Sequence, residues 1–279
     1  MENNAANNTT TLVLGGTGKT GRRVVEQLTA RDVSVRAASR STGTPFDWLD
    51  RSTWEPALAD VRAVYLVYLQ DLGHPDAAPH IRDFLRLAAS RGVERVVMLS
   101  ARGWDAARPS EQAVRDAGID WTILRPTWFA QNFSEDMFLP AILGGEVRLP
   151  TADGHEPFID AEDVAAVAVA ALTEDGHAGQ VYELSGPRLL TFGDAVGLIA
   201  KAAGREVRYA PISSEEFIAD LLQAGLTAEE APVVDGLLGL IARGDNAYLS
   251  DGVQRALGRE PRDFADFAER TAPTGAWHA

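Results

Sequence analysis

The 279-residue chain has ordinary contents of apolar (46%) and charged (24%) residues, but its formal net charge of −14 at pH 7 disfavours a nucleic-acid partner. Because the sequence contains no cysteine and only five scattered histidines, it excludes disulfides and thiol catalysis and predicts no metal site. No stretch has the pattern of a signal peptide or a membrane-spanning helix, so we expect a cytoplasmic protein with no membrane partner.

Short apolar runs alternate with amphipathic patterns through the first 124 residues. This alternation is typical of βαβ units and predicts a parallel sheet. The run at 96–99 is apolar at consecutive positions, as expected for a strand that is buried on both faces. The expected strands are 11–16, 33–38, 63–69, 95–100 and 120–124, and the expected helices are 20–31, 53–60, 79–91 and 109–117.

The pattern changes after Pro126, where an aromatic-rich segment begins. We expect an alanine- and valine-rich helix that ends near residue 172, a strand at 180–184 that returns to the sheet, and a mostly helical remainder with a short strand near 207–210. The predicted fold is α/β: a Rossmann-type doubly wound parallel sheet with a smaller, mostly helical substrate lobe. The predicted NADP-binding domain comprises 1–126 and about 159–186, and the predicted lobe comprises about 127–158 and 187–279.

The stretch LVLGGTGKTGRRV follows the first expected strand and opens the first expected helix. Its Gly18-Lys19-Thr20 matches the end of a P-loop, but that motif also needs a glycine five residues before Gly18, where this chain has Val13. Gly15, Gly18 and Gly21 instead match the dinucleotide-binding spacing, in which the glycines allow a tight turn, close approach to the pyrophosphate and close helix packing. The stretch therefore predicts dinucleotide binding by Gly15, Thr17, Gly18, Lys19, Thr20 and Gly21.

The end of the second expected strand indicates which dinucleotide binds. An NAD site usually has an acid there to bind the ribose 2′-hydroxyl, but this strand ends in Ser39-Arg40. Arg40, Ser39 and Lys19 can bind a 2′-phosphate through charge-assisted hydrogen bonds, so we expect NADP(H). The alternative is that Arg40 is only a solvated charge at the end of a strand.

Five segments distributed over nearly the whole chain resemble the NmrA-like branch of the atypical short-chain dehydrogenases/reductases: GGTGKTGRRV, VVMLSARG, GIDWTILRPTWFAQNF, PFIDAEDVAAVAVAAL and DGVQRALGREPRDFADFAERT. That branch includes NAD(P)H-dependent quinone and imine reductases and NADP-sensing regulators. The chain is particularly similar to bacterial proteins that carry an ergot-alkaloid-biosynthesis-like label. The resemblance implies an NAD(P)H-dependent oxidoreductase in which the backbone near Pro126 and Trp128 contacts the nicotinamide carboxamide.

The sequence departs from the superfamily at the usual acid/base pair, a Tyr with a Lys four residues later. None of the five tyrosines has this partner, and Gln112 stands where some family members have a lysine. Ser100 matches the catalytic Ser/Thr position of the superfamily, where it either polarises a substrate carbonyl or closes the end of a strand. Tyr68 either donates a proton beside the nicotinamide or packs in the core.

Several side chains are candidates for substrate contact. Aromatic residues that follow the expected strand at 120–124 either cover a flat substrate or form a core, and the histidine is either a site residue or exposed on a loop. The candidates are Trp104, Phe129, Asn132, Phe133 and His155. We expect an NADP(H)-dependent reductase of a quinone, carbonyl or imine group in a flat apolar molecule. The alternatives are a non-catalytic NADP(H) sensor and an isomerase-like relative, and the oligomeric state, monomer or dimer, stays open.

Overall fold

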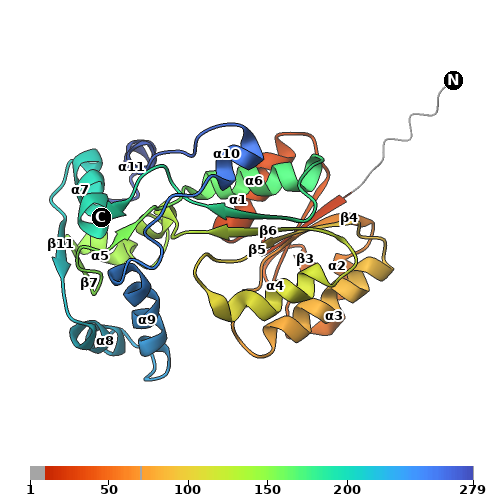
Figure 1. Ribbon diagram of the computed structural model, residues 1–279, viewed down its shortest axis with the longest axis horizontal. Helices are drawn as coiled ribbons and strands as arrows, with labels where there is room; N and C mark the ends of the chain where they lie inside the picture. Colours follow the sequence, from red (N-terminus) through yellow and green to blue (C-terminus); the bar gives the residue numbers. More distant parts are fainter. Residues whose placement is uncertain (1–9, 70, 279) are drawn as a thin grey trace. The chain divides into compact units, whose positions relative to one another are not determined.

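The computed structural model describes residues 10–69 and 71–278, and the chain forms two compact units (Figure 1). The first unit combines Met1–Pro126, Ala161–Leu184 and Gly252–Arg259. The second unit combines Thr127–Asp160, Ser185–Asp251 and Glu260–Ala279.

The first unit contains a seven-stranded sheet in the order β3-β2-β1-β4-β5-β6-β9, in which every neighbouring pair is parallel. Helices α1 and α6 cover one face of the sheet, and α3 and α4 cover the other (Figure 1). This arrangement confirms the predicted Rossmann-type fold. The strands are β1 (Thr10–Leu14), β2 (Val35–Ser39), β3 (Thr44–Pro45), β4 (Val61–Leu66), β5 (Arg95–Leu99), β6 (Asp120–Pro126) and β9 (Gln180–Leu184). The helices are α1 (Lys19–Thr29), η1 (Arg51–Thr53), α2 (Trp54–Ala57), α3 (Ala77–Ser90), η2 (Asp105–Ala107), α4 (Arg108–Arg115), α6 (Ala161–Thr173) and α10 (Gly252–Leu257).

The core of the first unit follows from the apolar pattern of the sequence. Strand β1 buries Leu12, Val13 and Leu14 completely, because helices cover both faces of a parallel sheet. Helix α3 is amphipathic and buries one apolar stripe that includes Ile81 and Phe84. Because all neighbouring strands are parallel, their carboxyl ends lie along one edge of the sheet, where ligands of this fold bind.

Helix α10 corrects one predicted domain boundary. We expected residues 252–259 in the smaller lobe, but α10 packs on α6 and β9 in the first unit. A Cβ atom built on Gly252 would lie 2.1 Å from the carbonyl oxygen of Glu183. Glycine therefore lets the helix backbone approach β9 closely, a tertiary requirement that the local pattern does not reveal.

The second unit is mostly helical and has its own aromatic core. Two small sheets complete it: β7 pairs with β11 in parallel, and β8 pairs with β10 antiparallel. Phe133 lies at the centre of the core, with its ring centroid 4.9 to 5.6 Å from those of Phe138, Phe158, Phe192 and Phe264. The elements are η3 (Ala130–Phe133), α5 (Leu139–Gly144), β7 (Glu146–Leu149), β8 (His155–Glu156), β10 (Leu190–Thr191), α7 (Phe192–Ala203), β11 (Arg208–Pro211), α8 (Ser214–Gln223), α9 (Glu230–Ala242), α11 (Phe264–Thr271) and η4 (Ala272–Thr274).

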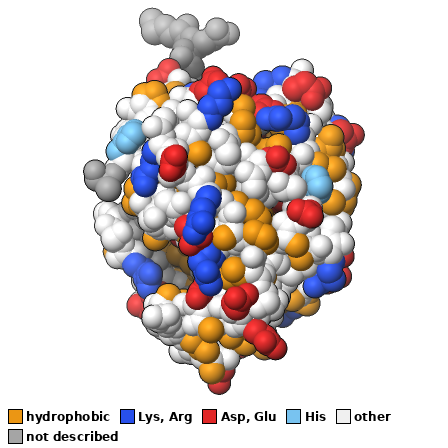
Figure 2. Space-filling model, turned by 90° about the vertical axis from the view of Figure 1, so that its left-hand side faces the viewer, with side chains coloured by type: hydrophobic (Ala, Val, Ile, Leu, Met, Phe, Trp, Pro, Cys, Tyr) orange, Lys and Arg blue, Asp and Glu red, His pale blue; other side chains and the backbone are white. Residues whose placement is uncertain are grey.

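The surface of the molecule mixes charges of both signs. Figure 2 shows basic and acidic side chains interspersed with hydrophobic ones over one face. Ion pairs such as Arg148–Asp220 at 3.0 Å are partly exposed, and pairs of this kind contribute about 0–1 kcal/mol each. Among the helices within 10–69 and 71–278, none is both long and apolar enough to cross a membrane.

Candidate cofactor and active site

The turn between β1 and α1 has the geometry of a dinucleotide loop. Gly15 has a φ of +63°, a left-handed conformation that side chains disfavour, and its carbonyl oxygen accepts a hydrogen bond of 2.8 Å from the Gly18 amide. A Cβ atom built on Gly21 would lie 2.1 Å from the same carbonyl oxygen. The turn and the helix can approach this closely only because neither glycine carries a side chain. The structural roles expected for the first and third glycines are therefore met.

The start of α1 is open to an anion. Gly18 precedes the helix in an extended conformation and, being a glycine, contributes no side-chain cap to the first turn. The first turn also lacks an acidic residue. The first N–H groups of any helix have no partner within the helix itself, and together with the helix dipole they favour a negative charge at such an end. Thr17 is exposed and Lys19 is half-buried at this end, whereas Thr20 is buried.

Arg40 lines a hollow of about 180 Å³ beyond the carboxyl end of β2, together with Phe46, Asp47, Trp48 and Leu69. Its side chain is exposed, whereas the aromatic rings that form the base of the hollow are buried. The Leu69 side chain also reaches to 3.5 Å from a Cβ atom built on Gly15. The hollow therefore adjoins the glycine turn, as an adenosine site on this fold should.

Ser39 and its neighbours form a tight turn beside Arg40. The Ser39 amide donates a hydrogen bond to the Thr42 hydroxyl (2.9 Å), and the Ser39 hydroxyl accepts one from the Ser41 amide (3.2 Å). Ser39 is buried, so it fixes the turn that holds Arg40 at the surface. Asp47 in the same hollow is an acid that we did not predict, and one of its carboxylate oxygens accepts a 2.9 Å hydrogen bond from the Leu49 amide.

Ser100 lies directly after β5, at the carboxyl edge of the sheet. Its hydroxyl donates a 2.8 Å hydrogen bond to Oε1 of Glu111, a carboxylate on α4 that is 2% exposed. The Arg125 guanidinium on β6 donates to both oxygens of that carboxylate, through Nε at 2.8 Å and through Nη2. Ser100 therefore lies at one end of a buried hydrogen-bond network that continues through Glu111 to Arg125.

The electrostatics of this network keep the Glu111 carboxylate ionised. Burial alone would raise the pKa of Glu111, but hydrogen bonds from Arg125 and Ser100 outweigh burial and lower the pKa below its ordinary value of 4.5. Arg108 and Arg115 add positive charge at 3.9 and 3.7 Å from Oε2. A charged acceptor with a fixed position therefore faces the Ser100 hydroxyl.

Tyr68 lies in the aromatic core of the first unit. The side chain is 5% exposed, its ring centroid is 5.0 Å from that of Trp48, and its hydroxyl forms a 3.0 Å hydrogen bond with Nδ1 of His80. Burial, followed by the negative charge of Asp76, raises the pKa of Tyr68. These contacts favour the core-packing alternative over proton donation.

Pro126 and Trp104 occupy the carboxyl side of the sheet. Pro126 ends β6, and its carbonyl accepts a 3.0 Å hydrogen bond from the Arg102 amide. Trp104 is half-buried beside a turn of the same unit, where its indole nitrogen is 3.1 Å from a Cβ atom built on Gly73. Trp104 follows the carboxyl end of β5, Pro126 is the last residue of the neighbouring strand β6, and both residues belong to the first unit.

Four of the expected site residues lie in the second unit, directly after Pro126. Trp128 and Phe129 are half-buried, and the Trp128 ring stacks on Phe138 with ring centroids 5.9 Å apart. The carbonyl of Asn132 accepts a 3.0 Å hydrogen bond from the Phe138 amide, and the Asn132 side chain is 9% exposed. Phe133 is fully buried in the aromatic core, so the expectation that it contacts substrate gives way to the core alternative.

The remaining histidine candidate is exposed. His155 lies in β8, paired with Thr191 of β10, and its side chain is at the surface of the second unit. The next residue, Glu156, is fully buried, and its Oε1 accepts a 3.2 Å hydrogen bond from the Trp128 amide. This carboxylate holds the backbone of the aromatic segment, a role that we did not predict.

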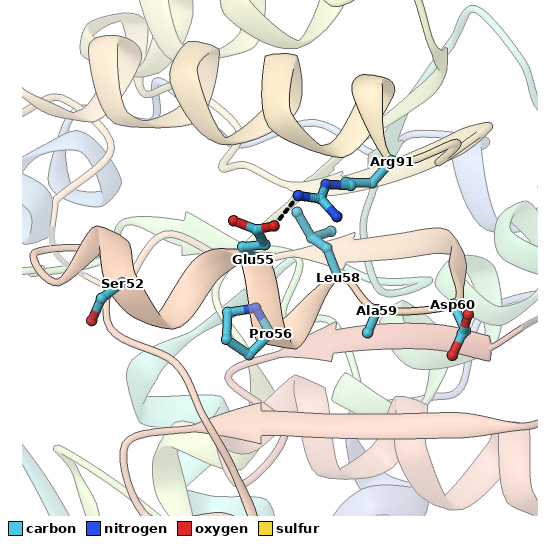
Figure 3. Close-up of a pocket in the computed structure, with 7 residues that line it drawn as sticks. All are labelled: Ser52, Glu55, Pro56, Leu58, Ala59, Asp60 and Arg91. Carbon is cyan, nitrogen blue, oxygen red and sulfur yellow. Dashed lines mark hydrogen bonds and ion pairs between the residues drawn. The ribbon is translucent and has the colours of Figure 1, made fainter.

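A separate hollow of about 620 Å³ lies at the opposite edge of the sheet (Figure 3). Glu55 on α2 forms an ion pair there with Arg91, which directly follows α3. Asp60 lines the same hollow and immediately precedes β4, so the hollow borders the amino ends of the strands. A dinucleotide binds at the carboxyl ends in this fold, and we therefore exclude this hollow as the cofactor site.

Sequence reasoning missed Asp47, Glu111 and Arg125. The signal for the last two was available: Glu111 shares the buried stripe of α4 with Val114, and Arg125 interrupts an apolar strand. A charge within an apolar stripe usually requires a buried partner. Which partner it finds depends on the packing of α4 on the sheet.

Comparison with known proteins agrees with this geometry. Residues 15–175 match the family described as NAD(P)H-binding. The oxidoreductase YesF of Bacillus subtilis (strain 168) is 36% identical over 269 residues, which cover 92% of this chain and 93% of that protein. An NAD(P)H azoreductase of Xenophilus azovorans is 31% identical over 286 residues, which cover 94% and 97%.

The fold has a similar counterpart among solved structures. An NADPH-dependent quinone oxidoreductase from Escherichia coli, complexed with NADPH, superposes with a TM-score of 0.78 at 24% identity, over 94% of this chain and 99% of that one. The chain therefore belongs to the NAD(P)H-binding family and is an NAD(P)H-dependent oxidoreductase.

Proposed function

We propose that this oxidoreductase transfers hydride from NADPH to a quinone, carbonyl or imine group of a flat, apolar small molecule. The bound nicotinamide supplies the hydride chemistry, and the chain binds and orients the reactants. The observation that carries the proposal is the exposed Arg40 guanidinium in the hollow that adjoins the glycine turn. An azoreductase and a quinone oxidoreductase among the similar proteins support the choice of acceptor by their names.

The preference for NADPH rests on Arg40. The first-turn N–H groups of α1 suit the pyrophosphate, and the guanidinium suits a 2′-phosphate. Ser39 acts through the turn that it fixes, and Asp47 in the same hollow is a proposed acceptor for the adenine amino group. Trp128 and Phe129 remain proposed substrate contacts because their rings are only partly buried.

The absence of a Tyr/Lys pair limits the kinds of hydride acceptor that the enzyme can reduce. Since none of the five tyrosines has a lysine four residues later, the proposed reaction favours a quinone or a substrate that brings its own acidic proton. The decisive assay is NADPH oxidation with a panel of quinones, azo dyes, cyclic imines and polyaromatic ketones. Micromolar NADPH binding without turnover of any acceptor would refute the proposal and favour an NADP(H) sensor.

The cofactor assignment has its own test. Arg40→Ala removes a charge-assisted contact worth about 1.5–3 kcal/mol, so NADPH should bind about ten- to a hundredfold more weakly while NADH binding stays nearly unchanged. Arg91→Ala is the matched control, because Arg91 lines the hollow at the opposite edge of the sheet (Figure 3). Equal losses of NADPH and NADH affinity in Arg40→Ala would contradict the assignment.

A further inference from the structure

The direction of the Ser100 hydrogen bond restricts what Ser100 can do for a ligand. A serine hydroxyl has one proton and two acceptor lone pairs. The Ser100 proton is directed to Oε1 of Glu111 at 2.8 Å. An ionised carboxylate can only accept, so Ser100 must be the donor in this pair. The hydroxyl oxygen is then left with acceptor capacity alone.

The Glu111 carboxylate is held in place so firmly that the Ser100 proton cannot readily turn elsewhere. Arg125 binds both carboxylate oxygens as a fork, and the Glu111 side chain is only 3% exposed. Rotation of the Ser100 hydroxyl would remove one hydrogen bond from a buried carboxylate, a change that low-dielectric surroundings make costly. The network therefore fixes the Ser100 hydroxyl as a hydrogen-bond acceptor for a ligand before any ligand binds.

We propose that Ser100 accepts a hydrogen bond from the substrate and that Glu111 is the positioning residue which imposes this role. The site consequently selects electrophiles that carry their own N–H or O–H group, such as a protonated imine. This inference rests on the proposed reductase function and deepens it. It replaces the expectation that Ser100 polarises a bare carbonyl, because that role needs the proton which Ser100 gives to Glu111.

The proposed selection also fits the missing acid/base pair. A protonated imine becomes a neutral amine when it accepts hydride at carbon: the C=N π electrons move to nitrogen, and no further proton is required. NADPH is oxidised to NADP+ in the same step. The chain then needs an acceptor that orients the N–H group, and Ser100 supplies one.

The test uses two iminium substrates that differ only in the substituent on nitrogen, hydrogen or methyl, so that only one of them has an N–H group. Protonated 3,4-dihydroisoquinoline has it, and N-methyl-3,4-dihydroisoquinolinium has the same ring and charge without it. For the native enzyme, kcat/KM should favour the N–H substrate. In Ser100→Ala this preference should fall about ten- to a hundredfold, mostly through kcat/KM of the N–H substrate, since a hydrogen bond to a charged group is lost.

Two further variants distinguish a positioning role of Glu111 from a purely structural one. The double variant Glu111→Leu/Arg125→Leu replaces the buried ion pair by apolar side chains, an exchange that proteins often tolerate. It frees the Ser100 hydroxyl to rotate, so the preference should again fall about tenfold. Ser110→Ala is the matched control, because Ser110 is a fully buried serine on the same helix that bonds the Leu72 carbonyl. It should keep the native preference.

The preference is a ratio measured on one preparation, so a partly unfolded variant does not disturb it. An unchanged ratio in Ser100→Ala, or equal losses for both substrates, would overturn the inference. Turnover of quinones with neither iminium reduced would also overturn it while leaving the proposed reductase function intact. If no acceptor at all is reduced, both the function and the inference fail.

Discussion

The closest contact in the cofactor turn makes Gly21→Ala the most informative perturbation. The new Cβ would lie 2.1 Å from the Gly15 carbonyl oxygen and 2.8 Å from its carbonyl carbon, well inside the 3.0 Å that Cβ atoms keep from other atoms. Both obstacles are backbone, so no side chain can rotate away. The start of α1 and the glycine turn must therefore separate by about 1 Å in a closely packed region.

This displacement should affect stability and cofactor binding together. Overpacking of a dense region costs about 1–3 kcal/mol, which corresponds to a fall in Tm of about 2–4 °C for each kcal/mol in a chain of this size. The same shift moves the N–H groups that face the pyrophosphate. Loss of one such hydrogen bond costs about 1–3 kcal/mol, so Kd for NADPH should rise about five- to a hundredfold.

The assay is calorimetric titration with NADPH and thermal unfolding of the same samples. Gly43→Ala is the matched control, because among the described residues other than its two chain neighbours none has an atom within 4 Å of a Cβ built there. It should change neither Tm nor Kd appreciably. Native Tm and native NADPH affinity in Gly21→Ala would refute the argument that the glycine is required by close packing.

Three other predictions follow from buried groups. The pKa of Glu111 is lowered on folding, so the contribution of this carboxylate to stability is present above pH 4.5 and disappears as the pH falls through its folded pKa. The difference in Tm between native and Glu111→Gln protein should therefore shrink in acid. A constant difference from pH 3 to 7 would contradict this. Phe133→Ala should destabilise the protein by about 3–5 kcal/mol in urea unfolding, whereas Trp128→Ala, at a partly exposed ring, should cost less. Tyr68→Phe removes only the hydrogen bond to His80, so kcat should stay within about twofold and stability should fall by about 1 kcal/mol; a hundredfold loss of kcat would restore Tyr68 as a proton donor.

Several features of the first unit could be predicted from the sequence because they are local. Alternation of apolar runs and amphipathic helices between β1 and β6 follows from the period of each element, and the glycine spacing follows from the turn between β1 and α1. Short elements were missed. Strand β3 has only two residues, Thr44–Pro45, too few for a period to be visible. Its place beside β2 nevertheless shapes the hollow that contains Arg40.

Pairings between distant segments could not be read from the chain. Strands β7 and β11 are joined in register, Val147 with Tyr209, across more than fifty intervening residues, and no local signal specifies that partner. Phe133 illustrates the same limit: an aromatic residue after a strand suits either a ligand or a core. Phe133 belongs to the core because Phe158, Phe192 and Phe264, which come from other elements, pack against its ring.

The candidate active site likewise has features that follow from the local sequence and features that depend on tertiary packing. The sequence by itself determined the Rossmann unit, the dinucleotide loop and the cationic end of β2, because each depends on residues that are neighbours along the chain. The tertiary structure alone decided where the Ser100 proton points, since Glu111 comes from α4 and Arg125 from β6. A hydroxyl can donate or accept equally well, and only the charge that packing places against it fixes the choice.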